Sequence, residues 1–339
     1  MISRSTQLIS TSLFLFSLSV TTVTAATDDC IQTITPADDA YTGILIDTHF
    51  HIPQTVDAAG KQPELGKNIT LAEIACTLKA EGTKSVFAFF PVYEDFDYEI
   101  FIKEARRAEA NYPKRFVPFL MPPTSDDDPP TANAKTLKQM LNSAPGLFQG
   151  YGEIGLYSFN DGPQYPPTAQ IFKNIYPVVR NHNLMVYFHP GQEQSEEFAQ
   201  TLAAHPNINF IVHGDQIQPY IDELMNNYDN IYYSVDMLYG DQYLLRPEVT
   251  KQEFLDAVAD TDTLLQIDWA TWKPLIEAHP TRFMWSTDRG DAVWTFDQEV
   301  GETLANHARA FIAGLDPAAQ ELFAYKNARR LMRQTGLGN

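Results

Sequence analysis

The sequence predicts a single domain of the α/β class, a (β/α)8 barrel with an insertion after the seventh strand. Three observations favour this fold. The chain has 339 residues, which is enough for one large barrel. From residue 44 onward, short apolar runs alternate with amphipathic helical patterns, and such runs are typical of parallel strands covered on both faces. No linker rich in Gly or Ser divides the chain, so we predict one barrel over residues 44–339.

The predicted strands are apolar runs that end in polar residues, proline or glycine. In chain order they cover residues 44–51, 85–92, 116–121, 149–157, 184–189, 208–213, 231–237 and 282–287. The predicted helices begin near Thr70 and otherwise cover residues 98–111, 132–142, 168–182, 196–204, 219–227, 296–313 and 317–334. Eight strands that alternate with helices favour one barrel over two doubly wound domains.

A long segment, residues 238–282, separates the seventh and eighth predicted strands and forms the expected insertion. We predict that it is helical in part, over residues 251–259. Long irregular segments in a compact domain are commonly functional. We therefore expect either a lid or substrate wall, or an oligomer contact, that uses the side chains of Tyr239, Tyr243, Arg246, Trp269 and Trp272.

Residues 1–26 have the pattern of a secretory signal peptide. Arg4 is the only charged residue among them, and residues 8–20 are apolar apart from Ser and Thr. Small residues at 24–26 offer a cleavage site. The apolar run is shorter than the roughly 20 residues that a membrane span needs. We expect export to a periplasmic or extracellular space through a cleaved signal peptide, with an uncleaved anchor as the alternative, and a polar tail over residues 27–43.

The charge of the chain limits its partners. Removal of residues 1–26 takes away Arg4 alone and leaves 23 basic against 43 acidic residues, a net charge of −20. Nucleic acids and anionic membranes both require a basic face, so neither is an expected partner. We expect a small-molecule substrate and no stable membrane association, and a homo-oligomer stays open.

Two cysteines, Cys30 and Cys76, remain after signal removal. In the helix that begins near Thr70 the apolar stripe turns Cys76 outward, where an N-terminal tail can lie across it. In an oxidising compartment a bridge between the two cysteines would stabilise the fold by roughly 4 kcal/mol through loop entropy. Two free thiols are the alternative.

The most informative stretch is residues 44–51, Ile-Leu-Ile-Asp-Thr-His-Phe-His. It predicts a buried strand that ends in polar residues. Alternate side chains of a strand share a face, so Asp47, His49 and His51 are expected to point the same way. Two imidazoles about 7 Å apart along a strand can lean towards one metal ion. A pair of structural polar residues at a strand end is the alternative.

Further metal-competent side chains fall at the carboxyl ends of other predicted strands. In a barrel these ends open on one rim, so residues far apart in the sequence converge there. Histidine and carboxylate ligands without thiolate suit Zn²⁺ and tolerate Mn²⁺ or Fe²⁺. The predicted metal ligands are His49, His51, Glu153, His189, His213 and Asp288.

With these residues the chain resembles the amidohydrolase superfamily, in particular the amidohydrolase-related metal-dependent hydrolases. The resemblance covers about residues 44–331. Its marks are Asp-Thr-His-Phe-His at 47–51, Gly-Glu-Ile-Gly-Leu at 152–156, His-Pro-Gly at 189–191, Pro-Asn-Ile-Asn-Phe-Ile-Val-His-Gly at 206–214, Phe-Met-Trp-Ser-Thr-Asp at 283–288 and Lys-Asn-Ala-Arg-Arg-Leu at 326–331. It implies a distorted TIM barrel of the metal-dependent hydrolase type with one or two divalent metals in its mouth.

The resemblance also implies roles for the ligands. His49, His51 and Asp288 would bind the first metal, with His189 shared or on the second. His213 would bind the second metal or, in a one-metal site, contact the substrate. Many relatives bridge two metals by a carboxylated lysine on strand four. This chain has Glu153 there, so the bridge would be a plain carboxylate.

Substrate contacts are expected from Arg289, Tyr187 and Trp269. Relatives often have an aromatic residue and a proline after the strand-eight aspartate, whereas this chain has Arg289-Gly290. Arg289 would hold an anionic group of the substrate. The alternative is an ion pair of Arg289 with Asp291 or Glu302 away from the pocket.

The expected activity is hydrolysis of a C–N or C–O bond in an amide, cyclic amide, ester or lactone by a metal-activated water. Asp288 would transfer the proton, His213 would stabilise the oxyanion, and Asp47 would orient a ligand histidine. Two alternatives stay open. One is a lyase with a single metal, a non-oxidative decarboxylase or hydratase, and the other is a barrel that only binds a metal or ligand.

Overall fold

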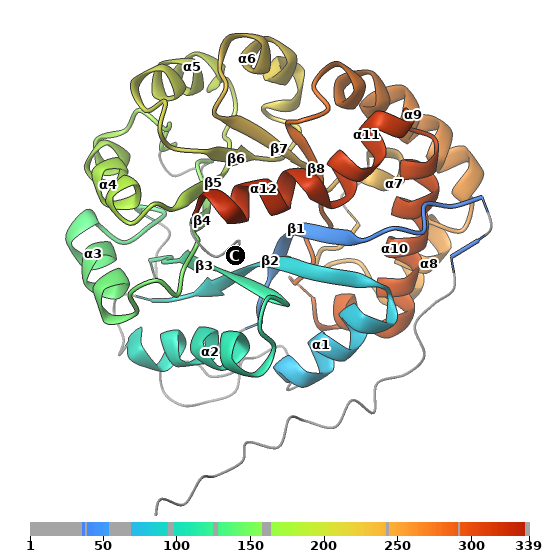
Figure 1. Cartoon of the computed structure of the whole chain (residues 1–339), viewed down its shortest axis with the longest axis horizontal. Helices are drawn as coiled ribbons and strands as arrows, with labels where there is room; N and C mark the ends of the chain where they lie inside the picture. The colour runs from blue at the N-terminus through green and yellow to red at the C-terminus, as the bar shows by residue number, and fades with distance from the viewer. Residues whose placement is uncertain are drawn as a thin grey trace, which may run out of the picture.

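The structure is a computed structural model that describes residues 36–37, 39–53, 69–93, 98–124, 128–157, 164–241, 244–290 and 292–335. Eight parallel strands follow one another around a barrel in chain order, which confirms the predicted (β/α)8 fold (Figure 1). The strands are β1 (Leu45–His51), β2 (Thr83–Pro91), β3 (Phe116–Met121), β4 (Gly150–Gly155), β5 (Met185–His189), β6 (Phe210–Val212), β7 (Ile231–Val235) and β8 (Phe283–Trp285).

Helices form a ring around the strands (Figure 1). They are α1 (Leu71–Ala80), α2 (Tyr98–Asn111), α3 (Ala134–Ser143), α4 (Gln170–Asn181), α5 (Ser195–Ala204), α6 (Ile221–Asn227), α9 (Thr261–Ala278) and α10 (Gln298–Ala313). Local sequence explains their starts. In α1, for example, the Thr70 hydroxyl accepts a hydrogen bond from the Glu73 backbone N–H while the Glu73 carboxylate accepts from Thr70 N–H. The remaining elements are α7 (Leu238–Asp241), α8 (Lys251–Ala257), α11 (Pro317–Glu321), α12 (Asn327–Gln334), and short turns at 218–220, 293–296 and 322–326.

The barrel interior is packed with large side chains, so it is a core and not a channel. Rings of β2, β3 and β5 fill it, among them Phe89, Phe119 and Tyr187, each fully buried. The end of the barrel where the strands begin is covered by α12, whose Leu331 belongs to this interior cluster. Figure 1 shows α12 lying across the middle of the strand ring. Functional side chains can therefore gather only at the opposite end, where the strands finish.

The seam between β8 and β1 is closed just beyond β8. The Asp288 N–H donates to His49 O at 3.0 Å, and the His51 N–H donates to Arg289 O at 2.7 Å. These two bonds draw the residues after β8 onto the end of β1. The last strand therefore delivers Asp288 to the two histidines of the first.

The segment after β7 is more regular than predicted. It contains α7, α8 and the 18-residue helix α9, which takes its place in the outer ring. The predicted lid residues Tyr239 and Trp272 are buried, at 3% and 1% exposed, and Trp272 packs on the Tyr233 ring. They therefore belong to the core, and the expectation that they face the substrate is wrong. Arg246 is exposed, and Tyr243 lies outside the described residues.

The N-terminal expectations lie largely outside the described residues, which begin at residue 36. Cys76 is half-buried on α1 and is disulfide-bonded. Cys30, the only other cysteine of the chain, is not among the described residues. In the described part of the chain, the helices are all too short or too polar to span a membrane.

Candidate metal centre

An irregularity in β1 directs its two histidines into the barrel mouth. Against β2, Asp47 pairs with Val86 and Phe50 pairs with Ala88, so β1 holds one extra residue between these pairs. Such a bulge breaks the alternation of faces. His49 consequently faces the barrel interior together with His51, whereas the Asp47 carboxylate does not. The expectation that Asp47 shares their face is therefore wrong.

Four ligand atoms from three strands form a first donor group. His49 Nε2 lies 3.1 Å from His51 Nε2, 3.0 Å from Glu153 Oε2 and 2.9 Å from Asp288 Oδ1. His51 Nε2 lies 3.1 Å and 3.3 Å from the same two oxygens. The group thus combines β1, β4 and the end of β8, in agreement with the convergence that the sequence predicts.

The spacing of the first donor group fits a divalent metal. Ligands about 2.0–2.1 Å from a zinc ion in a tetrahedron are separated from one another by about 3.3–3.4 Å. The five distances above, 2.9–3.3 Å, are close to this spacing. The chemistry of two imidazoles and two carboxylates, with no thiolate, suits zinc and also manganese or iron.

A second donor group shares Glu153 with the first. Glu153 Oε1 lies 2.6 Å from His213 Nε2 and 3.2 Å from His189 Nδ1, while Oε2 faces His49 and His51. One carboxylate therefore has one oxygen in each group, as the plain-carboxylate bridge requires. The three residues of the second group fit a further cation, since their ligand atoms lie within 4.8 Å of one another.

The backbone beside Glu153 can be formed only by glycine. Gly152 has φ +119°, and a Cβ there would lie 2.2 Å from the carbonyl oxygen of Tyr187 on β5. The close approach of β4 and β5 at this point carries Glu153 towards His189.

Asp236, at the end of β7, is a functional residue that the sequence analysis missed. Its Oδ2 lies 2.5 Å from His213 Nδ1 and 3.4 Å from His49 Nδ1. Both histidines therefore have one ring nitrogen at this carboxylate and the other, Nε2, at Glu153. A carboxylate on the far nitrogen fixes the orientation and tautomer of a metal-binding imidazole. Like His213, Asp236 directly follows a strand. The predicted seventh strand covers residues 231–237, which places Asp236 inside the strand and not at its end.

The charges of the site depend on one another. Burial alone would raise the pKa of Glu153, but the charges of His213 and His49 outweigh it and hold that pKa well below its ordinary value. Burial lowers the pKa of His51, whereas hydrogen bonds with Asp288 and Glu153 raise it more, to about 9. Burial also lowers the pKa of His213, but the negative charges of Asp236 and Glu153 raise it more, to about 9. The carboxylates are thus ionised, as ligands must be.

Arg289 does not face the mouth. Its guanidinium is 1% exposed and donates to Glu81 at the end of α1, at 2.8 Å and 2.6 Å. Asp47 lies beside this pair, 3.8 Å from Arg289, and accepts hydrogen bonds from the backbone N–H groups of His49 and Thr287. Arg289 therefore cannot bind an anionic substrate group, and its ionic partner among the described residues is Glu81 and not Glu302, whereas Asp291 lies outside the described residues. Asp47 holds the backbone between β1 and β8 and does not orient a histidine ring.

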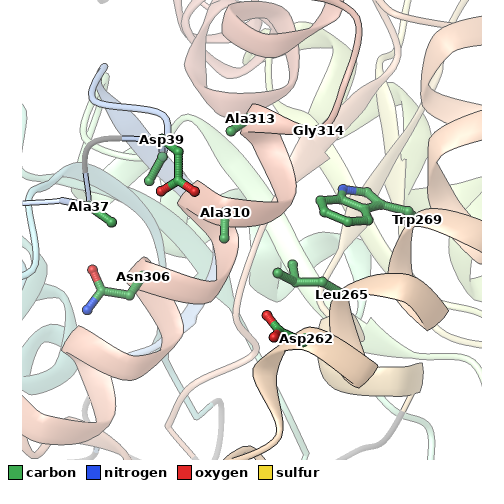
Figure 2. A pocket seen from close by; sticks show the side chains of 10 residues that line it. Ala37, Asp39, Asp262, Leu265, Trp269, Asn306, Ala310, Ala313 and Gly314 are labelled. Atoms are coloured by element: carbon green, nitrogen blue, oxygen red, sulfur yellow. The ribbon is translucent and has the colours of Figure 1, made fainter.

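The other two predicted substrate contacts are also wrong. Tyr187 is fully buried beneath the donor groups, with its ring 5.1 Å from that of His49. Trp269 lies in the helical ring, where its indole N–H donates to Phe311 O at 2.9 Å. It lines a cavity of about 700 Å³ between α9, α10 and the chain around Asp39 (Figure 2). That cavity shares no lining residue with the mouth.

The mouth itself is a pocket of about 380 Å³. Besides Asp236 and the members of the donor groups other than the fully buried His49, its lining consists of Tyr157, Gly214, Asp215, Gln216 and Met237. These residues follow β4, β6 and β7, so the wall of the pocket is built from the loops at the carboxyl ends of the strands. A pocket of this size admits a small molecule.

A family model described as amidohydrolase matches residues 46–334 of the chain. The match covers most of the sequence and includes both donor groups. The chain therefore belongs to the amidohydrolase family. No curated protein matches it.

Solved structures show the same fold. A zinc-bound amidohydrolase from Burkholderia multivorans is 13% identical, with a TM-score of 0.56, over 86% of this chain and 99% of that one. A TatD homologue from Escherichia coli K12 is 17% identical, with a TM-score of 0.50, over 87% and 97%. A 2,6-dihydroxybenzoate decarboxylase from Rhizobium superposes with a TM-score of 0.49 at 16% identity, over 87% and 100%. The first two of these structures share the fold of this chain, and at these identities the likeness concerns the fold alone.

Proposed function

We propose that this protein is a metal-dependent hydrolase that cleaves a C–N or C–O bond of a small amide, cyclic amide, ester or lactone. The observation that carries the proposal is the division of the Glu153 carboxylate between two histidine groups. Paired cations about 3.5–4 Å apart are typical of metal-assisted hydrolysis. The family membership and the acidic, histidine-rich mouth support the same reaction class.

The residues that would hold the cations follow from the two donor groups. His49, His51 and Asp288 with one oxygen of Glu153 would hold the first, and His189 and His213 with the other oxygen would hold the second. Zn²⁺ suits these ligands best, and Mn²⁺ or Fe²⁺ are also accommodated. A bound cation supplies a water of lowered pKa and polarises the scissile carbonyl.

Asp288 is the group that moves the proton. Burial raises its pKa, but the charges and hydrogen bonds of His49 and His51 lower it further than burial raises it, so the carboxylate is ionised at neutral pH. Its Oδ1 contacts both imidazoles. In the proposed reaction this carboxylate takes a proton from the attacking water and gives it to the departing nitrogen or oxygen. His213, held by Asp236, would serve in this reaction as a ligand of the second cation.

A second candidate is a lyase with one metal, a non-oxidative decarboxylase or hydratase. The observation that favours it is the completeness of the first donor group, which has four ligand atoms without His189 and His213. A single cation there leaves His213 available to a substrate.

The experiment that separates the two uses protein loaded with zinc or manganese. Its metal content is measured by mass spectrometry, and it is assayed with lactones, esters, amides, cyclic amides and aromatic acids. Two equivalents of metal per chain, together with turnover of an ester, a lactone or an amide, support the hydrolase. One equivalent with release of CO₂ from an aromatic acid supports the lyase. Metal binding without turnover on the whole panel would favour a binding protein.

We also propose that the protein is exported. The support is the signal-like sequence of residues 1–26 and the acidic balance of the remainder. Fractionation of the producing cells followed by N-terminal sequencing tests this. The expected mature protein begins at Thr27, and an intact Met1 in the soluble cytoplasmic fraction would contradict export.

A further inference from the structure

Gln216 lies in the loop after β6 and lines the mouth, three residues beyond His213. It belongs to neither donor group. Its Oε1 lies 3.3 Å from His189 Nε2, within hydrogen-bond distance, and both side chains are partly buried. His189 thus has Gln216 at one ring nitrogen and Glu153 at the other, since Nδ1 lies 3.2 Å from Glu153 Oε1.

Both ring nitrogens of His189 face hydrogen-bond acceptors, and the contact with Gln216 is the one that remains when a cation takes Nδ1. The amide oxygen of glutamine only accepts hydrogen bonds, so the proton of a neutral imidazole must be on Nε2 for the bond to form. The lone pair is then on Nδ1, the atom that faces Glu153. A histidine binds a metal through its unprotonated nitrogen, so Gln216 prepares His189 to complete the second donor group.

Gly214 shows that the loop is shaped around this contact. Its φ is +87°, in the left-handed region, and a Cβ there would lie 2.8 Å from Gln216 Oε1 and 3.0 Å from His189 Nε2. A side chain at position 214 would therefore press directly on the two bonded atoms. Glycine leaves them room to meet.

The other histidine of the second group is held differently. His213 has the buried carboxylate of Asp236 at its Nδ1, at 2.5 Å. A charged acceptor binds an N–H more strongly than a neutral amide does. His189 is therefore the more weakly held of the two histidines, because its partner at Nε2 is the uncharged side chain of Gln216.

We propose that Gln216 is a positioning residue that stabilises the metal-binding tautomer of His189, with the proton on Nε2, and thereby sets the affinity of the second cation site, while the first site does not depend on it. The proposal rests on the two-cation centre of the proposed function.

The test is a zinc titration of the full mature chain against a chromophoric chelator, which gives separate affinities for the first and second equivalents. In Gln216→Met the acceptor is lost at nearly constant volume, and the second equivalent is expected to bind about 10-fold more weakly. In Gln216→Glu an acceptor oxygen remains, so the second affinity is expected to equal or exceed that of the unchanged protein. The affinity for the first equivalent of zinc is expected to be the same in both variants as in the unchanged protein.

Gln252→Met is the matched control, because Gln252 is exposed on α8 and contacts Asp256 instead of a histidine. Circular dichroism establishes that each variant is folded. The proposal is wrong if Gln216→Met leaves the second affinity unchanged, if it weakens both equivalents alike, or if Gln216→Glu weakens the second as much as methionine does. If the protein without substitutions binds only one equivalent of zinc, the two-cation function itself is wrong. This result distinguishes a failure of the proposed function from a failure of the role of Gln216.

Discussion

Asp236 and His213 form a short polar contact behind the donor groups, with Oδ2 2.5 Å from Nδ1. The same oxygen lies 3.4 Å from His49 Nδ1, so one buried carboxylate stands behind a histidine of each donor group. The orientation of the His213 ring therefore depends on a residue outside the predicted ligand set, and the same residue lies near His49.

Removal of this carboxylate should weaken metal binding. In Asp236→Ala the Nδ1 atoms of His213 and His49 lose their partner, and we expect zinc affinity to fall by about 10- to 100-fold. Competition with a chelator measures this. Asp222→Ala is the control, because Asp222 pairs with His279 at 2.8 Å on the surface. Equal zinc affinity in the two variants would contradict the role given to Asp236.

Asp288 should be required for turnover and not for folding. In Asp288→Asn the side chain keeps its size but loses its basicity, so we expect turnover to fall by a factor of about 10² to 10⁴. Steady-state kinetics on the best substrate of the panel measures the loss, with circular dichroism as the folding check. Asp215→Asn is the matched control, since Asp215 lines the same mouth but belongs to neither donor group. Retained activity in Asp288→Asn would rule out its proton transfer.

The buried ion pair behind the centre should stabilise the fold. Arg289 and Glu81 are both fully buried, and Glu81→Gln leaves a buried guanidinium without its closest counter-charge, with Asp47 3.8 Å away as the remaining one. We expect the free energy of unfolding in urea to fall by about 3–5 kcal/mol. Glu299→Gln, which removes one partner of an exposed Lys251 pair, is expected to cost less than about 1 kcal/mol. A small effect of Glu81→Gln would show that the pair is not important for stability.

The metal-free protein should lose stability as the pH rises from about 6.5 to 9. His51 and His213 have pKa values raised to about 9 in the folded protein, against 6.5 for an ordinary histidine. A group whose pKa is raised on folding stabilises the fold below its unfolded value and loses that contribution as the pH rises through the folded value. Thermal unfolding in EDTA at several pH values measures this.

Zinc should reverse the trend with pH. Metal ligands must be deprotonated, so zinc affinity is expected to rise over the same interval and binding at pH 7.5 to release protons. Calorimetry in two buffers of different ionisation enthalpy counts the protons.

For the metal-free protein, a melting temperature that rises between pH 6.5 and 9 would contradict the protonation states assigned to His51 and His213.

Local patterns were sufficient for much of the fold and of the centre. The apolar runs of β1, β2 and β3 and the position of each polar residue at a strand end are properties of short segments. The barrel topology then brings Glu153, His189, His213 and Asp288 together with the histidines of β1. Nothing beyond the alternation of strands and helices is needed for that convergence.

Contacts between distant segments explain what the sequence could not predict. The extra residue of β1 becomes visible only against its pairing with β2, and it reverses the face of Asp47. The partner of Arg289 is Glu81, 208 positions away in the sequence. Trp269 lies in the long segment after the seventh predicted strand, and only the fold shows that this part of the segment is α9, a helix of the outer ring.

The first donor group spans the seam of the barrel, because three of its four ligands come from the earliest strand and from the residues just past the latest one. A cation held by His49, His51 and Asp288 would consequently tie the two extremities of the sheet to each other. The site is complete only after residue 288 has been synthesised. A cation bound there would therefore indicate that the barrel has closed. Without the ion, two backbone hydrogen bonds, Asp288 to His49 and His51 to Arg289, would still join these segments.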